Sequence, residues 1–231
     1  MQARYLRNVP ALTEDECAML GTKKVCVVGC GGLGGHIIEQ LARIGIGEIR
    51  CVDGDHFEET NLNRQIFSTE ALLGKSKAET AAKRVYAINS GINVRPYYTY
   101  LNEENAAEII RGCDAVLGGL DNIPTRKILS HACSQEGIPY IYGAISGWVA
   151  QAGVSMPGDG LIDRLYPRDT ALTDKSVLSF TPALCASMQA ALCVKLLTGR
   201  PVESGVLYYF DLMDMEPERI EMLPKCDGDL L

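Results

Sequence analysis

The sequence has 231 residues, of which 47% are apolar and 22% charged, so the chain can bury a substantial core and extensive disorder is excluded. Its formal charge is -7, and Lys and Arg are spread thinly, which argues against a nucleic acid or an anionic membrane as the main partner. We expect no stretch of membrane-spanning length and no secretory signal, and therefore a cytoplasmic chain.

The predicted elements alternate between buried strands and helices over the first two thirds of the chain. An N-terminal arm, residues 1–21, is expected to carry a short helix capped by Thr13. Beyond the arm, apolar runs predict strands and helical spacing predicts helices. These are a strand at 24–29, a helix at 33–44, a strand at 48–53, a helix at 76–89, a strand at 93–98, a helix at 102–111, a strand at 114–120, a helix at 124–135 and a strand at 139–142. The order indicates an α/β, Rossmann-like, doubly wound, mostly parallel sheet.

The last third of the chain departs from this alternation. It predicts a strand at 149–156, a crossover loop at 157–180, a helix at 181–199 and two C-terminal antiparallel strands at 206–212 and 219–223. Neither an internal repeat nor a low-complexity linker divides the chain. We therefore predict a single domain over residues 1–231.

A glycine-rich turn follows the first strand. Its GxGxxG pattern is formed by Gly29, Gly31, Gly32 and Gly34. Glycines let the backbone approach a phosphate closely, and the following helix adds unpaired N–H groups and a favourable dipole. Asp53 closes the second strand, where a carboxylate can accept hydrogen bonds from ribose hydroxyls. Both features name a nucleotide as the ligand, without deciding between NAD and ATP.

A second polar cluster, downstream of Asp53, favours ATP. It contains Asp55, Asn61, Arg64, Gln65 and Lys77. A dehydrogenase has no need of such a loop, whereas an enzyme that handles a triphosphate must neutralise charge as pyrophosphate leaves. A guanidinium and an ammonium bind phosphate oxygens in complementary ways. Taken singly, either cation could instead be a solvated surface charge.

Asp121 follows the fourth predicted strand, together with Asn122. Ligands of open α/β sheets bind at the carboxyl ends of the strands, and a carboxylate there can hold Mg²⁺ with water and phosphate completing the shell. The alternative is a structural role, in which Asp121 caps the helix beginning near Pro124, and one residue can serve both roles.

With these motifs in their order and spacing, the chain resembles the ThiF, MoeB and HesA family of ubiquitin-activating-like adenylyltransferases. The resemblance covers most of the chain. It implies that Asp53 binds the ribose of ATP, that Asn61, Arg64, Gln65 and Lys77 surround the phosphates, and that Asp121 holds Mg²⁺. Arg7 matches the arginine that reaches into the partner subunit's ATP site in the family, which implies a homodimer.

The activity that the resemblance implies is adenylation of the C-terminal carboxylate of a small ubiquitin-like sulfur-carrier protein ending in Gly-Gly, with release of pyrophosphate. Carriers for thiamine or for molybdenum and tungsten cofactors fit, as do a peptide or a tRNA-base acid, although the acidic balance disfavours RNA. A carboxylate is ionised at neutral pH, so it can attack phosphorus without a general base. Catalysis would then come from Arg7, Arg64, Lys77 and Asp121.

Cysteines mark where the chain departs from the family. Many members hold a structural zinc with two CxxC pairs, but no two of the nine cysteines here have that spacing, and we predict no zinc. The loop before the last long helix carries no cysteine for a thioester, and Cys185 and Cys193 are expected in the core. Small buried thiols indicate a reducing compartment.

Two rival functions remain at this stage. An NAD-dependent oxidoreductase explains the glycine turn and Asp53, but leaves Arg64, Lys77 and Asp121 without a role. A non-catalytic module that binds a carrier protein or a nucleotide explains the missing cysteines, but not the intact phosphate cluster.

Overall fold

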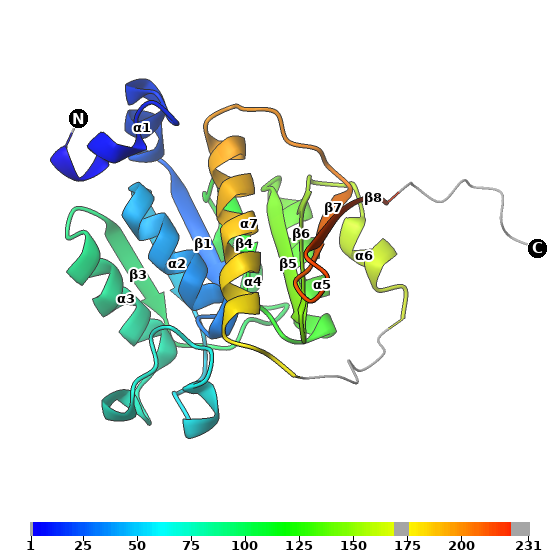
Figure 1. Cartoon of the computed structure of the whole chain (residues 1–231), viewed down its shortest axis with the longest axis horizontal. Helices are drawn as coiled ribbons and strands as arrows, with labels where there is room; N and C mark the ends of the chain where they lie inside the picture. The colour runs from blue at the N-terminus through cyan, green and yellow to red at the C-terminus, as the bar shows by residue number, and fades with distance from the viewer. Residues whose placement is uncertain (1, 169–175, 223–231) are drawn as a thin grey trace, which may run out of the picture.

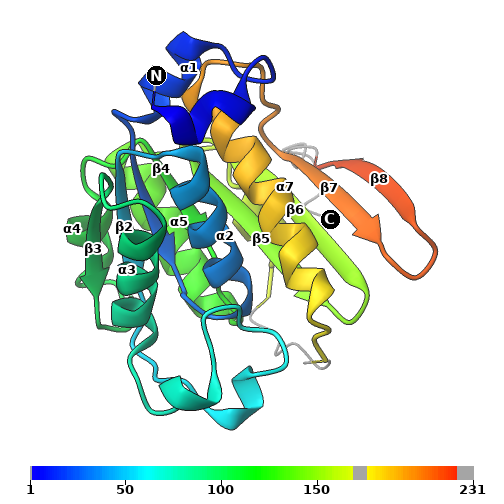
Figure 2. The ribbon, with the colours of Figure 1, turned by 60° about the vertical axis from the view of Figure 1, so that its left-hand side comes forward.

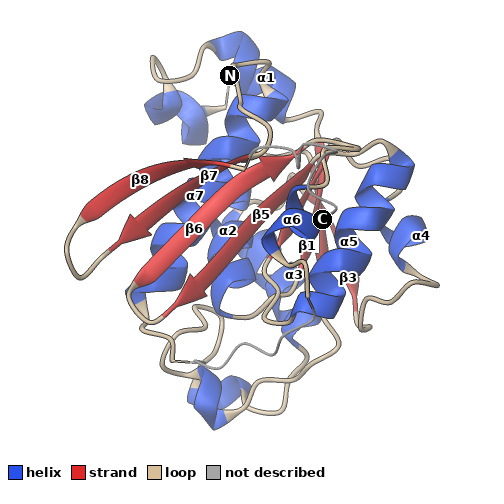
Figure 3. Cartoon of the chain, turned by 90° about the vertical axis from the view of Figure 1, so that its right-hand side faces the viewer, coloured by secondary structure: helices blue, strands red, loops and turns tan. Residues whose placement is uncertain are grey.

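The computed structural model describes residues 2–168 and 176–222, and its eight strands form one sheet in the order β3-β2-β1-β4-β5-β6-β7-β8 (Figure 1). The strands are β1 (Lys24–Val28), β2 (Glu48–Val52), β3 (Asn93–Tyr97), β4 (Ala115–Gly118), β5 (Tyr140–Ser146), β6 (Val149–Ser155), β7 (Val206–Asp211) and β8 (Glu216–Glu221). From β3 to β5 all neighbours pair in parallel, and from β5 to β8 they pair antiparallel (Figure 3). The predicted fold class is confirmed.

Helices cover both faces of the parallel half (Figure 2). On one face lie α2 (Gly32–Ile44), α3 (Lys77–Ile88) and α7 (Phe180–Leu197), and on the other lie α4 (Ala106–Ile110), α5 (Ile123–Glu136) and α6 (Leu161–Leu165). Three short 3₁₀ helices complete the set: η1 (Ala3–Asn8), η2 (Glu59–Asn61) and η3 (Glu70–Leu72). Each face encloses its own apolar cluster, so the central strands are buried on both sides, as continuous apolar runs require.

The N-terminal arm consists of η1 and α1 (Glu14–Leu20), and it lies at the amino ends of the parallel strands (Figure 1). The predicted Thr13 cap is present as a full capping box with Glu16. The hydroxyl of Tyr5 accepts a hydrogen bond of 2.6 Å from Nδ2 of Asn89, the residue that ends α3. Arg200 binds the Glu16 carboxylate through two nitrogens, at 2.7 and 2.8 Å. Both parts of the arm, η1 and α1, are therefore hydrogen-bonded to the rest of the fold.

Several predicted boundaries need correction. The strand β5 runs to Ser146, beyond the expected end at 142, and β8 begins at Glu216, before the expected start at 219. The helix expected at 102–111 is only α4, because Asn102 and Asn105 bond to nearby backbone amides in a turn that competes with the helix. The crossover loop expected at 157–180 contains α6, which is only five residues long and too short to show a helical period. The segment 169–175 of that loop lies outside the described residues.

The helix α7 also corrects an expectation. Phe180–Leu197 is the one helix in the described part of the chain that is long and apolar enough to cross a membrane by length and composition. Half of its residues are buried within the fold, where it packs on α2, β5 and β6. Its apolar character is that of a helix covered by the fold on several sides.

Candidate active site

A cavity of about 330 Å³ opens at the carboxyl ends of β1, β2, β3 and β4. Its walls are the turns that follow these strands, so residues far apart in sequence meet there. The predicted site residues that line it are Gly29, Gly31, Gly32, Asp53, Asp55, Arg64, Gln65, Lys77 and Asp121. The two predicted clusters, the glycine turn and the downstream polar loop, therefore face one space.

The glycine turn forms the floor of the cavity. Gly29 has φ +91, in the left-handed region that favours glycine, and a Cβ there would lie 2.5 Å from the Gly119 oxygen. A Cβ at Gly119 would lie 2.7 Å from the Gly34 nitrogen. Glycines from the turn, from α2 and from the end of β4 thus pack directly on one another. Gly34 serves this packing and does not line the cavity.

Asp53 is tied to the glycine turn by the backbone. Its carboxylate accepts the Cys30 amide at 2.7 Å and the Asp55 amide at 2.8 Å. Burial raises the pKa of Asp53, and these two amide bonds oppose that rise. The carboxylate thereby fixes the spacing between the turn after β1 and the turn after β2.

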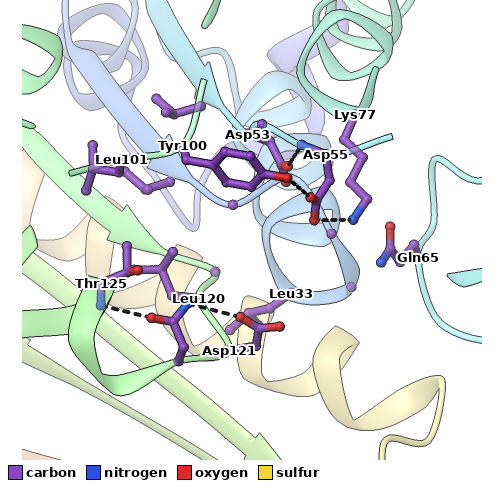
Figure 4. Close-up of a pocket in the computed structure, with 18 of the residues that line it drawn as sticks. Leu33, Asp53, Asp55, Gln65, Lys77, Tyr100, Leu101, Leu120, Asp121 and Thr125 are labelled. Atoms are coloured by element: carbon purple, nitrogen blue, oxygen red, sulfur yellow. Dashed lines mark hydrogen bonds and ion pairs between the residues drawn. The ribbon is translucent and has the colours of Figure 1, made fainter. Parts of the chain in front are cut away.

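Lys77, Asp55 and Tyr100 form a chain of hydrogen bonds along one wall (Figure 4). The Lys77 ammonium lies 3.1 Å from Asp55 Oδ2, and the Tyr100 hydroxyl donates to Asp55 Oδ1 at 2.6 Å. Lys77 is buried although it is the first residue of α3, and its amide donates to the Asp55 carbonyl at 3.0 Å. The ammonium is thus fixed at the edge of the cavity.

Arg64 and Gln65 lie against the start of α2. The Arg64 side chain comes within van der Waals reach of a Cβ at Gly32, and its guanidinium donates at 2.9 Å to the Thr60 carbonyl. Gln65 is buried beside Gly31, and its Oε1 has no hydrogen-bond partner. A buried amide oxygen without a partner in a binding cavity indicates a position that a ligand or water completes.

Asp121 and Asn122 divide the two roles that the sequence left open. Asn122 caps α5, accepting the Thr125 amide at 2.9 Å. The exposed Asp121 carboxylate receives a bond of 3.3 Å from Asn122 Nδ2 and lines the cavity. Because the neighbouring residue provides the cap, Asp121 has oxygen lone pairs left for a ligand.

Two further predicted residues lie away from the cavity. Asn61 is buried in η2, where its Oδ1 accepts the Glu58 amide at 3.1 Å, so its side chain is engaged in the local turn. Arg7 is exposed in η1, part of the arm at the amino ends of the parallel strands, whereas the cavity lies at their carboxyl ends. Within one copy of the chain, Arg7 does not reach the site.

Several lining residues have no motif in the sequence. Among them are Tyr100, Gly119, Arg126, Ser176 and Val177. Gly119, one of two successive glycines after an apolar run, could have been suspected of a close backbone contact. The others reach the cavity only through strand order and through the return of the crossover loop, which no local pattern reveals.

Arg126 and Gln189 bridge an opening in the sheet beside the cavity. The strands β4 and β5 pair over only two positions, ending at Leu117 and Ile141. From α7, Gln189 Nε2 donates at 3.0 Å to the Gly118 and Ile141 carbonyls. From α5, Arg126 donates to the Gly143 carbonyl at 2.7 Å and to the Leu120 carbonyl. Side chains here replace the missing ladder bonds.

The first zinc position and the two cysteines nearest the expected thioester loop can be examined in the described residues. Asp159 accepts hydroxyl hydrogen bonds from Ser155 and Ser204, at 2.6 and 2.5 Å, while the second CxxC position, 225–229, lies outside the described residues. Cys185 and Cys193 are fully buried, and burial raises the pKa of each thiol to about 12. Neither thiol is suited to nucleophilic chemistry. The lack of zinc stays a prediction.

Comparison with known proteins places this geometry in a family. The model of the ThiF family matches residues 3–228. A SAMP-activating enzyme E1 of Haloferax volcanii is 36% identical over 229 residues, covering 94% of this chain and 84% of the relative. An adenylyltransferase and sulfurtransferase MOCS3 of Xenopus laevis is 35% identical, covering 91% of this chain and 49% of the relative. The chain thus spans about half the length of that longer relative.

Solved structures agree on the fold. The crystal structure of E. coli MccB with ATP superposes with a TM-score of 0.82 at 23% identity, covering 98% of this chain and 73% of that one. The structure of PaaA has a TM-score of 0.75 at 22% identity, covering 90% of this chain and 67% of that one. The predicted enzyme class, an adenylyltransferase, is confirmed by the relatives. With a family match over nearly its full length, the chain belongs to the ThiF family.

Proposed function

We propose that the chain binds ATP with Mg²⁺ in this cavity and adenylates the C-terminal carboxylate of a small ubiquitin-like sulfur-carrier protein, releasing pyrophosphate. The observation that carries the proposal is that Arg64, Lys77 and Asp121 line the same cavity as the glycine turn. Two cationic side chains and a carboxylate beside the glycine turn suit the binding of a triphosphate. A hydride transfer does not require these charged groups.

The residues that line the cavity support binding of the phosphates and the ribose of ATP. The turn at Gly31 and Gly32 opens α2, so unpaired amides and the helix dipole favour phosphate there. Asp53, at the neighbouring strand end, is the proposed acceptor for ribose hydroxyls, and the adjacent Asp55 lines the same cavity. The unpartnered Oε1 and the amide nitrogen of Gln65 supply further polar contacts at the start of α2.

Asp121 is the residue that we propose as the Mg²⁺ ligand. Its exposed carboxylate has free lone pairs, and Mg²⁺ is usually held by one or two carboxylates plus phosphates and water. The ion would neutralise charge on the phosphates. In the described part of the chain no cluster of three ligating side chains surrounds it, which suits an ion that arrives with its nucleotide.

The reaction itself is a substitution at phosphorus. An oxygen of the carrier's carboxylate forms a bond to the α-phosphorus of ATP, the bond from that phosphorus to the bridging oxygen breaks, and its electron pair leaves with pyrophosphate. The carboxylate is already ionised, so no base is needed. Arg64 and Lys77 stabilise the charge that gathers on the departing phosphates.

A second copy of the chain completes the proposed site. Arg7 can approach a cavity only in a neighbouring subunit, because its arm lies at the amino ends of its own parallel strands and the cavity lies at their carboxyl ends. A homodimer in which each arm serves the partner's cavity is therefore part of the proposal.

The eight described cysteines are free and buried, which supports a reducing, cytoplasmic setting.

ATP–pyrophosphate exchange tests the proposal. Purified protein is incubated with MgATP, labelled pyrophosphate and a Gly-Gly-ending carrier, and label should enter ATP only when the carrier is present. Asp121→Ala should abolish exchange while leaving carrier binding intact. A wild type that binds carrier and never exchanges with any cognate carrier would favour a non-catalytic module instead.

A further inference from the structure

Tyr100 follows β3 and lines the cavity without belonging to any motif. Its ring lies on the backbone of Gly54, where a Cβ would come within 2.7 Å of the ring carbons. Its carbonyl accepts a hydrogen bond of 2.9 Å from Asn105 Nδ2. The Gly54 backbone therefore supports one face of the ring and the Asn105 amide fixes the Tyr100 backbone, although 67% of the residue's surface is exposed.

The hydroxyl of Tyr100 acts on Asp55 and, through it, on Lys77 (Figure 4). One carboxylate oxygen of Asp55 accepts from the phenol at 2.6 Å and the other pairs with the ammonium at 3.1 Å. Asp53 and His56 are the other ionisable groups close to this carboxylate. Burial would raise the pKa of Asp55, but Tyr100, Lys77 and His56 together hold that pKa below its ordinary value.

Lys77 faces two anions when nucleotide binds, because both Asp55 and a phosphate need its ammonium. A phenol that donates to Asp55 takes up part of the carboxylate's accepting capacity and charge. The ion pair between Asp55 and the Lys77 ammonium is then weakened but not broken. Loss of the hydroxyl would leave Asp55 more strongly paired with Lys77 and more repulsive to phosphate.

We infer that Tyr100 is a positioning residue for the phosphate tail of the nucleotide, and that it sets the place and availability of the Lys77 ammonium through Asp55. The inference rests on the proposed function, since it takes Lys77 to be a phosphate ligand. It requires no contact between Tyr100 and phosphate.

Titration calorimetry of Tyr100→Phe with MgATP and with adenosine tests the inference. The variant keeps the ring and removes only the hydroxyl. The Kd for MgATP should rise about tenfold, the scale of a hydrogen bond to a charged group. The Kd for adenosine should not change, because adenosine carries no phosphate. A role limited to packing would weaken both ligands alike.

Two further variants sharpen the test. Tyr98→Phe makes the same chemical change two residues away, where the hydroxyl contacts the His56 ring at 3.2 Å and does not line the cavity, and it should bind both ligands as wild type. In an Asp55→Asn background, Tyr100→Phe should have no additional effect on MgATP, since the route through the carboxylate is already gone.

Three results would each overturn the inference while wild-type binding of MgATP stands. They are equal weakening of MgATP and adenosine, an unchanged affinity for MgATP, and a loss caused by Tyr100→Phe that is as large in the Asp55→Asn background as in the wild type. A wild type that binds no MgATP would overturn the proposed function itself, so the two failures are distinguishable.

Discussion

At the scale of single residues, Lys77 concentrates the chemistry of the site. It is buried, paired with Asp55 and placed at the first turn of α3. We predict that Lys77→Ala lowers carrier-dependent pyrophosphate exchange by about 10²-fold, the usual effect of removing one preorganised charge-stabilising donor. Lys83→Ala, on an exposed face of the same helix, is the control and should exchange as wild type. Equal rates of pyrophosphate exchange in the two variants would show that Lys77 does not contribute to catalysis.

Gly119 is one of the glycines whose substitution should destabilise the fold through a backbone clash. A methyl group on residue 119 would lie 2.7 Å from the backbone nitrogen of Gly34. The atoms nearest to it all belong to the backbone, which cannot move aside as a side chain can. We predict that Gly119→Ala lowers the free energy of unfolding by about 1–3 kcal/mol, measured by urea denaturation. Gly91→Ala, where a Cβ meets only the Asn89 side chain at 3.4 Å, should stay within about 0.5 kcal/mol of wild type.

The same residues show what could be predicted locally. Gly29, Gly31, Gly32 and Asp53 can be singled out from the sequence because a strand, a turn and a helix follow one another directly, and all four line the cavity, whereas Gly34 does not. Tyr100 could not be found, because it reaches Asp55 only through the parallel pairing of β2 with β3. Asn61 has a residue type suited to phosphate, yet the 3₁₀ turn around it uses its side chain.

At the scale of elements, the link between α1 and the end of α7 should depend on pH. Hydrogen bonds from Arg200 and the Thr13 backbone lower the pKa of Glu16 from 4.5 to about 2. A lowered pKa means that the ionised form stabilises the fold, fully above pH 4.5 and less as pH falls towards 2. Glu16→Gln should therefore lower Tm at neutral pH, and the gap to wild type should close on acidification.

Thermal unfolding of wild type, Glu16→Gln and Glu14→Gln across this pH range provides the measurement. Glu14 lies in the same first turn and serves as the control for the loss of a charge near the helix N-terminus. A gap for Glu16→Gln that does not vary with pH would show that the carboxylate's ionisation is not what ties the arm down.

Element types were predictable, and element ends were less so. The strand β1, which is buried at four of its five positions, stands out as an apolar run. The short α6 and the shortened α4 do not, since five residues make little more than one turn and side-chain bonds to the backbone decide where they stop.

At the scale of the whole molecule, the arm lies at the amino ends of the parallel strands (Figure 1), and the cavity lies at their carboxyl ends. If each subunit's Arg7 serves its partner, Arg7→Ala and Asp121→Ala should each lose exchange activity as purified dimers. Mixing the two after subunit exchange should restore activity, because one cavity of each mixed dimer then has both a native arm and a native carboxylate. Up to about one quarter of wild-type activity is expected, from half of the dimers with one of two sites intact.

The mixture is measured beside each variant alone and beside a mass determination that confirms the dimer. If a mixture shown to contain mixed dimers stays inactive, Arg7 does not act in the partner's cavity. The carboxyl-end location of the site could be predicted from the strand order, whereas the distance between Arg7 and that site is a property of the folded chain.

The opening between β4 and β5 has a consequence for redesign. Elsewhere in the sheet the spacing of strands is dictated by main-chain pairing and cannot be adjusted by changing a side chain. Beside the cavity, by contrast, Gln189 and Arg126 hold the strands by their own reach. Shorter or longer replacements at these two buried positions should therefore change the separation of β4 and β5 beside the cavity, which the main chain does not set there.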